Sequence, residues 1–344
     1  MKALLWTEIE KMTWTDADQP AAGFGEVVIR TEVVGICGSE LEGYLGHNSL
    51  RKPPMIMGHE FCGRISSLGE RVSGLSVGTK VTVNPLLSCG VCDRCARGRN
   101  QLCDRRQIIG IHRPGAFGQY VAVPASAVVP VKEDTPSARA ALAEPLACSL
   151  RAVRRAFEQG HTFPNVLVFG AGGIGLLCAK VARLLGADLI GIVDTNPARL
   201  DIALRVGAAD FALDPGTGDI VDAAKRACGP KGVDVVIDAA GFPPTRSAAV
   251  RALNAGGTLM NIGLGVNETH LPVNDLIRSE IDVLGSFCYI PKDFRDAVQL
   301  LTNGQVNENG WTMVRPIEDG DAAFRELTSG RVAEGKILLT VPGE

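Results

Sequence analysis

Four cysteines within fifteen residues are the most distinctive chemical feature of the sequence. Their spacing is C-x2-C-x2-C-x7-C, at Cys89, Cys92, Cys95 and Cys103. A short loop with this spacing can wrap four thiolates around one tetrahedral ion, and four sulfur ligands leave no position open for a substrate. The spacing therefore predicts a structural metal site with zinc as the expected ion, and an iron–sulfur cluster is the first alternative.

A glycine-rich hexapeptide is the second chemical feature. The run Gly170-Ala171-Gly172-Gly173-Ile174-Gly175 fits G-x-G-x-x-G, follows an apolar run and opens a segment with helical periodicity. In a dinucleotide site such glycines allow a tight turn, close approach to the pyrophosphate and tight helix packing, and the helix N-terminus receives the phosphate charge. We therefore expect dinucleotide binding at Gly170, Gly172, Gly173, Ile174 and Gly175.

An acidic residue follows at the distance that such a site requires. Asp194 lies 19 residues beyond Gly175, at the end of the next apolar run. A carboxylate there accepts hydrogen bonds from the adenine ribose diol and repels a 2′-phosphate, which favours NAD over NADP. Arg199 makes this preference less sharp, because a guanidinium there can stack on adenine or reach a phosphate.

These groups need a scaffold, and the hydrophobic pattern predicts one. From about residue 165 apolar runs alternate with helical segments, with strands expected at 166–169, 189–193, 211–213, 233–238, 258–263 and 281–286. Helices fit between them at 174–185, 197–206, 220–227 and 245–253. This alternation is typical of a doubly wound parallel sheet. Before about residue 145, short Val/Ile/Gly segments separated by turns predict a β-rich unit that begins with an N-terminal strand.

Composition excludes several classes of protein. The chain has 344 residues, of which 46% are hydrophobic and 21% charged, so a disordered protein is excluded. Its net charge of -3 provides no overall positive field that would attract nucleic acid. Glycine is frequent, at 40 residues, which predicts many turns. No signal peptide is expected, because the N-terminus carries acidic residues early and lacks an apolar core. No membrane span is expected either, because a proline and several glycines interrupt the longest uncharged stretch. In the cytoplasm, clustered cysteines favour metal over disulfides.

Three further motifs give the sequence a family resemblance. They are Gly35-Ile36-Cys37-Gly38-Ser39-Glu40, Gly58-His59-Glu60 and Ala143-Glu144-Pro145-Leu146. Together with the cysteine loop and the glycine-rich turn, they resemble zinc-dependent medium-chain alcohol dehydrogenases over essentially the full chain. The segment that contains Glu144 resembles the third metal-ligand segment in the branch of sorbitol, other polyol and threonine dehydrogenases. The resemblance implies a GroES-like catalytic domain at 1–147 with a metal lobe at about 85–106, a Rossmann domain at 148–286 and a return to the catalytic domain at 287–344.

The resemblance also implies a second, catalytic zinc site. Cys37, His59 and Glu144 would hold the ion, and Glu60 would be a neighbour able to exchange onto it. Glu40 would orient the zinc histidine. With the structural site, this implies two zinc ions per chain.

The resemblance leaves the roles of other residues on the Cys37 loop open. Ser39 matches the family's proton-relay hydroxyl, but Glu42 stands where a histidine often continues the relay. Three options remain open, because Glu42 could take the proton, the route could run through water and Glu60, or Glu42 could bind a substrate hydroxyl. Tyr44 and His47 are candidate substrate contacts on the same loop. The strand ends at Gly263 and Ser286 are expected beside the nicotinamide.

The expected function follows from these implied sites. It is zinc- and NAD-dependent oxidation of a secondary hydroxyl of a polyol, sugar or sugar acid to a ketone, by hydride transfer from a zinc-bound alkoxide. The alternatives are a threonine-type amino-alcohol dehydrogenase, which the segment 110–117 resembles, and a non-catalytic, zinc-stabilised NAD-binding sensor. We expect a cytoplasmic homo-oligomer, a dimer or tetramer with segment 282–290 at a subunit contact, that acts on a small molecule and binds neither nucleic acid nor membrane.

Overall fold

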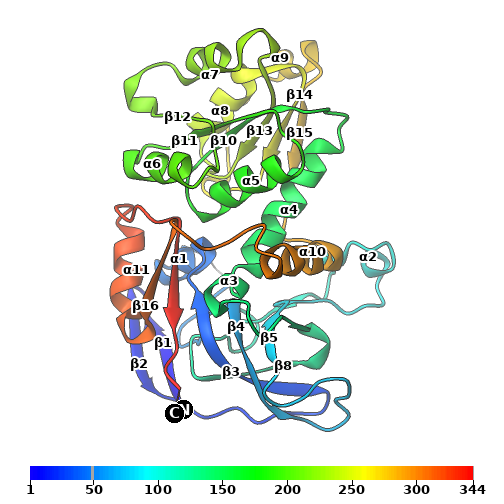
Figure 1. Cartoon of the computed structure of the whole chain (residues 1–344), viewed down its shortest axis with the longest axis vertical. Coiled ribbons are helices and arrows are strands. Elements are labelled where there is room, and N and C mark those ends of the chain that lie inside the picture. The colour runs from blue at the N-terminus through cyan, green and yellow to red at the C-terminus, as the bar shows by residue number, and fades with distance from the viewer. Residues whose placement is uncertain (48–49, 344) are drawn as a thin grey trace.

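The computed structural model describes residues 1–47 and 50–343. Its architecture is built on two large sheets with a long helix between them (Figure 1). One sheet lies in the upper half of Figure 1 and the other in the lower half, and α4 (Ala143–Phe157) runs from one to the other. Both chain ends lie at the bottom of the lower half. Within the described residues, no helix is long and apolar enough to cross a membrane.

The upper sheet is parallel throughout and forms the predicted dinucleotide-binding fold. Its strand order among the described residues is β12-β11-β10-β13-β14-β15, the order of a doubly wound sheet. The strands are β10 (Asn165–Phe169), β11 (Leu189–Val193), β12 (Phe211–Leu213), β13 (Val233–Asp238), β14 (Leu253–Asn261) and β15 (Asp282–Gly285). The helices are α5 (Gly173–Leu184), α6 (Pro197–Arg205), α7 (Ile220–Cys228), α8 (Pro243–Ala252) and α9 (Val273–Arg278). Every residue of β10 is buried, because helices cover both faces of a parallel sheet.

The lower sheet combines strands from both ends of the chain. Its order is β16-β17-β3-β4-β5-β9, and β8 also pairs with β3. The strands are β3 (Glu26–Gly35), β4 (Glu60–Leu68), β5 (Lys80–Val83), β8 (Tyr120–Pro124), β9 (Val128–Pro130), β16 (Thr312–Pro316) and β17 (Lys336–Thr340). The C-terminal segment therefore returns to the N-terminal sheet, where β17 pairs antiparallel with β3. Helix α11 (Gly320–Thr328) also packs on this part of the molecule.

The N-terminus differs from the expected single strand. It forms a hairpin of β1 (Lys2–Glu8) and β2 (Lys11–Asp16), because the chain reverses at Glu10, whose φ is 60°. A tight reversal of this kind uses the left-handed region that few side chains adopt. The first strand was predicted correctly, but its turn carries no glycine that would have marked the reversal.

Short elements hold the cysteine loop and the start of α4. The two-residue strands β6 (Leu86–Leu87) and β7 (Gln107–Ile108) pair and close the loop, which contains α2 (Asp93–Ala96). Helix α3 (Ser137–Ala140) precedes α4, and α10 (Pro291–Thr302) packs against α4. The expected domain boundary at residue 147 falls inside α4, so a continuous helix spans it.

We expect the ion pairs between α4 and α10 to fix the position of α4. Arg154 binds Asp293 at 2.8 Å and Asp296 at 2.6 Å, and only 2% of the Asp293 side chain is exposed. Replacing Arg154 by methionine leaves a buried carboxylate unpaired, so Arg154→Met should lower the free energy of unfolding by about 3 kcal/mol. Thermal unfolding of the variant measures this loss.

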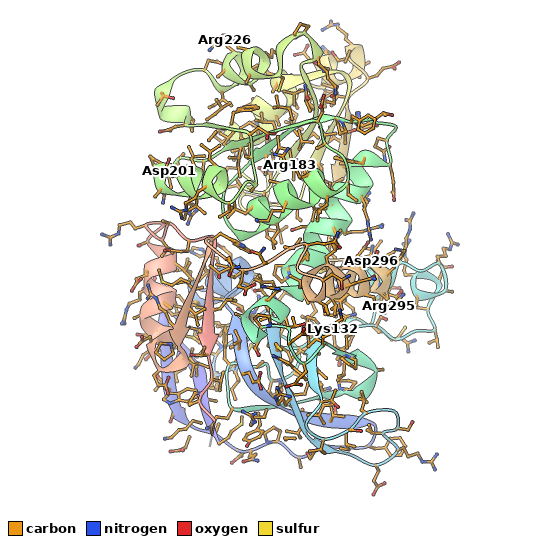
Figure 2. All side chains as sticks on the ribbon, viewed as in Figure 1. Lys132, Arg183, Asp201, Arg226, Arg295 and Asp296 are labelled. Carbon is orange, nitrogen blue, oxygen red and sulfur yellow. The ribbon has the colours of Figure 1, made fainter. Side chains whose placement is uncertain are left out.

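The matched control changes Arg183 of α5, which is labelled in Figure 2. Arg183→Met removes the more exposed pair of Arg183 with Asp210. Surface pairs contribute about 0 to 1 kcal/mol, so its unfolding midpoint should stay close to that of the parent. Equal shifts in the two variants would contradict the role given to Arg154.

Candidate active site

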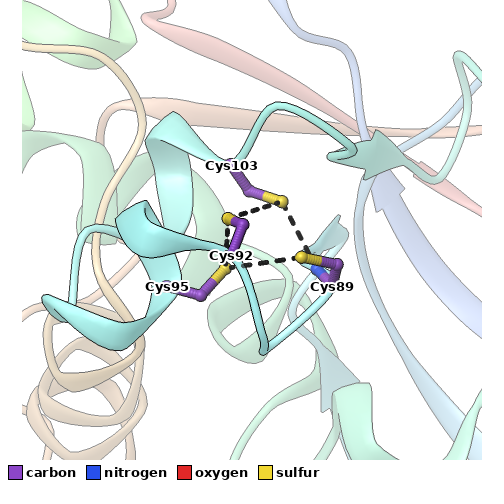
Figure 3. A group of neighbouring side chains, drawn as sticks. All are labelled: Cys89, Cys92, Cys95 and Cys103. Atoms are coloured by element: carbon purple, nitrogen blue, oxygen red, sulfur yellow. Dashed lines mark hydrogen bonds between the residues drawn. The ribbon is translucent and has the colours of Figure 1, made fainter.

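The four predicted lobe cysteines meet at one point (Figure 3). Their sulfur atoms lie 3.5 Å (Cys92 to Cys95), 3.8 Å (Cys92 to Cys103) and 4.0 Å (Cys89 to Cys95) apart. A tetrahedral zinc with Zn–S bonds of about 2.3 Å has sulfur–sulfur edges of about 3.8 Å. The arrangement therefore fits one zinc ion, whereas a larger iron–sulfur cluster would hold the sulfurs further apart.

Backbone geometry prepares this loop for a metal. Hydrogen bonds from the backbone of Val91 and Cys92 lower the pKa of the Cys89 thiol to about 6. Thiolates are the form that binds metal. Gly90 and Gly98 adopt positive φ of 73° and 70°, which lets the short loop reverse twice around the sulfurs.

A second group of possible metal ligands lies where the lower sheet meets α4. Cys37 precedes α1 (Gly38–Tyr44), Glu60 is the first residue of β4, and His59 directly precedes it. Their ligand atoms all lie within 4.8 Å of one another. The antiparallel pairing of β3 with β4 sets Gly35 opposite Glu60, which brings residues distant in sequence to one end of the sheet.

Glu40 fixes the orientation of this group. Its buried carboxylate accepts hydrogen bonds from the backbone of Cys37 at 3.0 Å and of Gly58 at 2.9 Å, and from His59 Nδ1 at 2.7 Å. Burial alone would lower the pKa of His59, but Glu40 and Cys37 raise it well above its usual value. Because Nδ1 is occupied, Nε2 is the ring nitrogen left for a metal.

Glu144 lies beside the group but outside the set of closest ligand atoms. It begins α4, is 8% exposed, and accepts a hydrogen bond from Cys148 Sγ at 3.5 Å. Burial raises its pKa, and among the described residues it forms no ion pair with lysine or arginine. A buried carboxylate without a cation is costly, so a metal ion here would stabilise it. Thiol, imidazole and carboxylate are also ligands that zinc accepts.

Glu60 is engaged elsewhere. Both of its carboxylate oxygens lie 2.8 Å from Lys336 Nζ, which also donates to the Ile36 carbonyl at 3.2 Å. Lys336 and Glu60 are both buried. The lysine therefore holds Glu60 beside Cys37 and His59 without requiring it to bind a metal.

Ser39 is also close to the group. Its hydroxyl donates to Cys37 Sγ at 3.4 Å, and its oxygen accepts from Arg51 Nη2 at 3.2 Å. Arg51 is 3% exposed and additionally binds the Ser39 carbonyl at 2.8 Å. The serine hydroxyl is therefore oriented on the thiol by a buried cation.

The candidate substrate contacts Tyr44, Glu42 and His47 have their hydrogen-bond or ion-pair partners outside the group of Cys37 and His59. Tyr44 is 1% exposed, donates its hydroxyl to the Glu10 carbonyl at 2.7 Å and packs on Phe324. This corrects the expectation of a substrate contact, because the ring belongs to the core and its hydroxyl is occupied. Glu42 is half exposed and lies 3.4 Å from His47 Nδ1 at the surface.

Four of the predicted dinucleotide residues line one cavity of about 700 Å³. Gly170, Gly172, Asp194 and Arg199 line it, and Gly173 and Gly175 lie in the first turn of α5. Ile174 follows Gly173 in the same turn. Asp194 accepts hydrogen bonds from the backbone of Ala171 at 2.7 Å and Asn196 at 2.8 Å, which holds the carboxylate at the end of β11.

Gly263 and Ser286 lie elsewhere. They follow β14 and β15 and line a separate cavity of about 510 Å³, which shares no lining residue with the first. The two strand ends nevertheless lie together, because β14 and β15 pair in register. A role beside the nicotinamide remains a prediction for these two residues.

Sequence reasoning missed several residues of the site. Lys336 and Arg51 pair with predicted residues only through the tertiary fold. Arg251 and Thr245 line the dinucleotide cavity from α8. No sequence motif marks these residues, although a lysine at the start of an otherwise apolar C-terminal strand was a weak signal.

Comparisons with known proteins agree with this architecture. The pattern of the alcohol dehydrogenase GroES-like domain matches residues 23–133, and that of the zinc-binding dehydrogenases matches residues 173–303. L-galactonate-5-dehydrogenase of Escherichia coli (strain K12) is 33% identical, over 89% of this chain and 88% of that one. Probable D-xylulose reductase A of Emericella nidulans is 32% identical, over 92% and 90%. A crystal structure of a zinc-binding dehydrogenase from Sinorhizobium meliloti 1021 bound to NADP superposes with a TM-score of 0.90 at 30% identity, covering 98% of both chains.

The fold and these two sites define an oxidoreductase that uses zinc and a nicotinamide dinucleotide. The chain belongs to the zinc-dependent medium-chain alcohol dehydrogenase family. The family expected from the sequence is therefore confirmed, as is the combination of a GroES-like part with a Rossmann sheet.

The lobe geometry predicts a metal count. Cys92→Ser should reduce the zinc content of the purified protein from about two ions to about one per chain, because one of four sulfur ligands is lost. Cys228→Ala, which changes a buried cysteine of α7, is the control and should retain both ions. Elemental analysis measures the content, and iron in place of zinc would contradict the assignment.

Two glycines of the nucleotide turn should respond differently to alanine. A Cβ at Gly175 would lie 1.7 Å from the Gly170 carbonyl oxygen, whereas one at Gly172 would meet no atom within 4 Å. Gly175→Ala should therefore lower the unfolding midpoint. Gly172→Ala should leave the midpoint unchanged but weaken NADH binding about tenfold or more, because the methyl group obstructs the pyrophosphate.

Thermal unfolding and NADH fluorescence titration separate the two effects. Unchanged NADH affinity in Gly172→Ala would show that the dinucleotide does not approach this turn.

Proposed function

We propose that the chain oxidises a secondary hydroxyl of a polyol, sugar or sugar acid to a ketone, with NAD as the hydride acceptor. The observation that carries this proposal is the meeting of the partly buried Cys37 with the buried His59, beside the buried carboxylate of Glu144. Relatives whose names refer to L-galactonate and D-xylulose support this class of substrate. Asp194 at the dinucleotide cavity supports NAD over NADP, because its carboxylate would repel a 2′-phosphate.

Different residues of the chain would hold the two zinc ions and orient their ligands. Cys37, His59 and Glu144 would hold the catalytic zinc, while Cys89, Cys92, Cys95 and Cys103 would hold the structural one. When bound, the catalytic zinc is a Lewis acid that makes a hydroxyl easier to deprotonate, and NAD takes up the hydride. Glu40 fixes the tautomer of His59 by accepting its Nδ1 hydrogen.

Ser39 is the proposed first carrier of the released proton. Its hydroxyl lies beside Cys37, and Arg51 holds its oxygen in place. A route through Glu60 would have to break a buried ion pair with Lys336, which is costly. Glu42 lies at the surface beside His47, so it can take the proton only at the outer end of a route.

The proposal includes a cytoplasmic homo-oligomer. β15 is the edge strand of the upper sheet, and Val283 on it is 42% exposed. An exposed apolar edge strand can pair with a second copy of the same chain.

The direct test is reduction of NAD by the zinc-loaded enzyme with a panel of polyols, sugars and sugar acids. L-threonine belongs in the same panel, because faster oxidation of threonine would favour the amino-alcohol alternative. About one zinc ion per chain, with NAD binding but no turnover on any compound, would favour the sensor alternative, whereas the enzyme should hold about two.

Glu144→Gln tests the metal role of Glu144. Loss of a charged ligand should lower kcat/KM by at least about 10- to 100-fold, the range seen when even the outer partners of metal ligands are removed. Zinc content should fall toward one ion per chain. Glu70→Gln, at an exposed carboxylate, is the matched control and should retain both activity and metal. Full zinc content and unchanged kcat/KM in Glu144→Gln would overturn the assignment.

A further inference from the structure

The cavity of about 510 Å³ beside Gly263 and Ser286 has an unusual lining. It lies between the cysteine lobe, α4 and the ends of β14 and β15, and four arginines but no carboxylate line it. These arginines come from three separate parts of the chain: Arg99 from the lobe, Arg151 and Arg155 from α4, and Arg246 from α8. Distant segments therefore bring positive charge to one place.

Most of this charge is not neutralised by the protein. Arg99, Arg151 and Arg155 form no ion pair within the described part of the chain, while Arg246 lies 3.4 Å from Asp238. Burial and the charges of Arg151 and Arg99 lower the pKa of Arg155, and the charge of Glu158 offsets only part of this effect. Like charges held together without a counterion raise the free energy of the site, and a bound anion would offset this.

Arg154 shows that the pattern is local. It lies between Arg151 and Arg155 on α4, yet it binds two aspartates of α10. The face of α4 toward α10 is therefore charge-balanced, and the face toward the cavity is not.

Three side chains that line the same cavity each carry a buried polar atom without a hydrogen-bond partner in the described part of the chain. Gln101 is 5% exposed, and its Oε1 has no hydrogen-bond partner among the described residues. The same holds for Arg151 Nε and Ser286 Oγ. Buried polar atoms are almost always hydrogen-bonded, so a cluster of them indicates a missing ligand. Two of the three atoms can donate a hydrogen bond, as an oxyanion requires.

The cavity also lies close to the proposed reaction centre. Phe287 lines it and lies under Arg106, whose guanidinium carbon is 5.1 Å from the ring centre. The next residue is Cys288, and burial and then the charge of Glu144 raise the pKa of its thiol. Helix α4 joins the two places, because Glu144 and Arg151 lie seven residues apart on it, about 10 Å along the helix axis. The glycine-rich turn lines the other cavity, so the dinucleotide pyrophosphate does not account for these arginines.

We infer that this cavity binds the carboxylate or phosphate of the substrate, which makes the substrate a sugar acid or a phosphorylated polyol instead of a neutral polyol. Arginine suits this task, because its planar guanidinium binds two oxygens of a carboxylate or phosphate at once. The inference rests on the proposed function, since it identifies the anionic end of the same substrate.

Matched pairs of compounds test the inference in the zinc-loaded enzyme. Each alditol is compared with the aldonate and with the alditol phosphate of the same stereochemistry, and kcat/KM is measured for NAD reduction. At least one anionic member should exceed its neutral partner by tenfold or more, which corresponds to a single charge-assisted hydrogen bond. The aldonate and phosphate arms identify which anion is preferred.

The outcomes separate the two proposals. Activity on neutral members equal to or above that on their anionic partners would overturn the anion site but retain the dehydrogenase. No turnover on any member of any pair would overturn the proposed function itself.

Variants locate the preference in the cavity. Arg99→Gln and Arg151→Gln should each reduce kcat/KM for the preferred anion by about 10- to 100-fold, mainly through KM, and by much less for the neutral partner. Arg151→Lys should recover part of the loss, because it restores the charge without the planar fork. Arg97→Gln is the control on the same lobe, since Arg97 is exposed and pairs with Asp93.

Inorganic sulfate gives a second readout that does not depend on choosing the right substrate. It should inhibit competitively against the substrate and not against NAD, and Arg151→Gln should weaken this inhibition. An anion preference that persists in both glutamine variants would overturn the assignment to this cavity.

Discussion

The buried ion pair between Lys336 and Glu60 is the contact on which the geometry of both candidate sites depends. It joins β17 to β4 across 276 positions of the sequence, and both partners are buried. Removing either partner would leave a charge without compensation, which is more costly than never having buried the pair. Gly335, next to Lys336, packs closely against Gly173. A Cβ added at Gly173 would lie 2.7 Å from the Gly335 carbonyl oxygen. One short strand therefore fixes the acidic group and the start of the nucleotide helix relative to each other.

The balance of charge around this pair explains why the group suits a dication. Glu40, Glu60, Glu144 and the Cys37 thiol face Lys336, Arg51 and His59. Glu40 is compensated by His59, and Glu60 by Lys336. Glu144 and Cys37 remain without a cation of their own, and they come from different elements, α4 and the end of β3. A metal ion at their meeting point would complete the charge balance that the protein leaves open.

The sequence predicted the parts of these sites that depend on local spacing. The cysteine lobe and the turn at Gly170 each lie within one short segment, so residue type and spacing were enough. Lys336 and Arg51 were not predictable, because their partners are set by strand pairing and packing across the fold. Tyr44 shows the opposite error. Its position in a loop beside Cys37 predicted a substrate contact, but packing on Phe324 from the other end of the chain buries it.

Opposite electrostatics at the two ends of the proposed substrate site would orient an anionic substrate. The metal-binding group is rich in carboxylates, whereas the cavity beyond Phe287 carries arginines and no carboxylate. A substrate anion would be attracted by Arg99 and Arg151, whereas Lys336 and the metal would already be paired with Glu60 and Glu144. A polyol chain between the two ends would then present its hydroxyls, and not its charged end, to the metal. In this arrangement the arginines would determine which carbon is oxidised as well as which substrate binds.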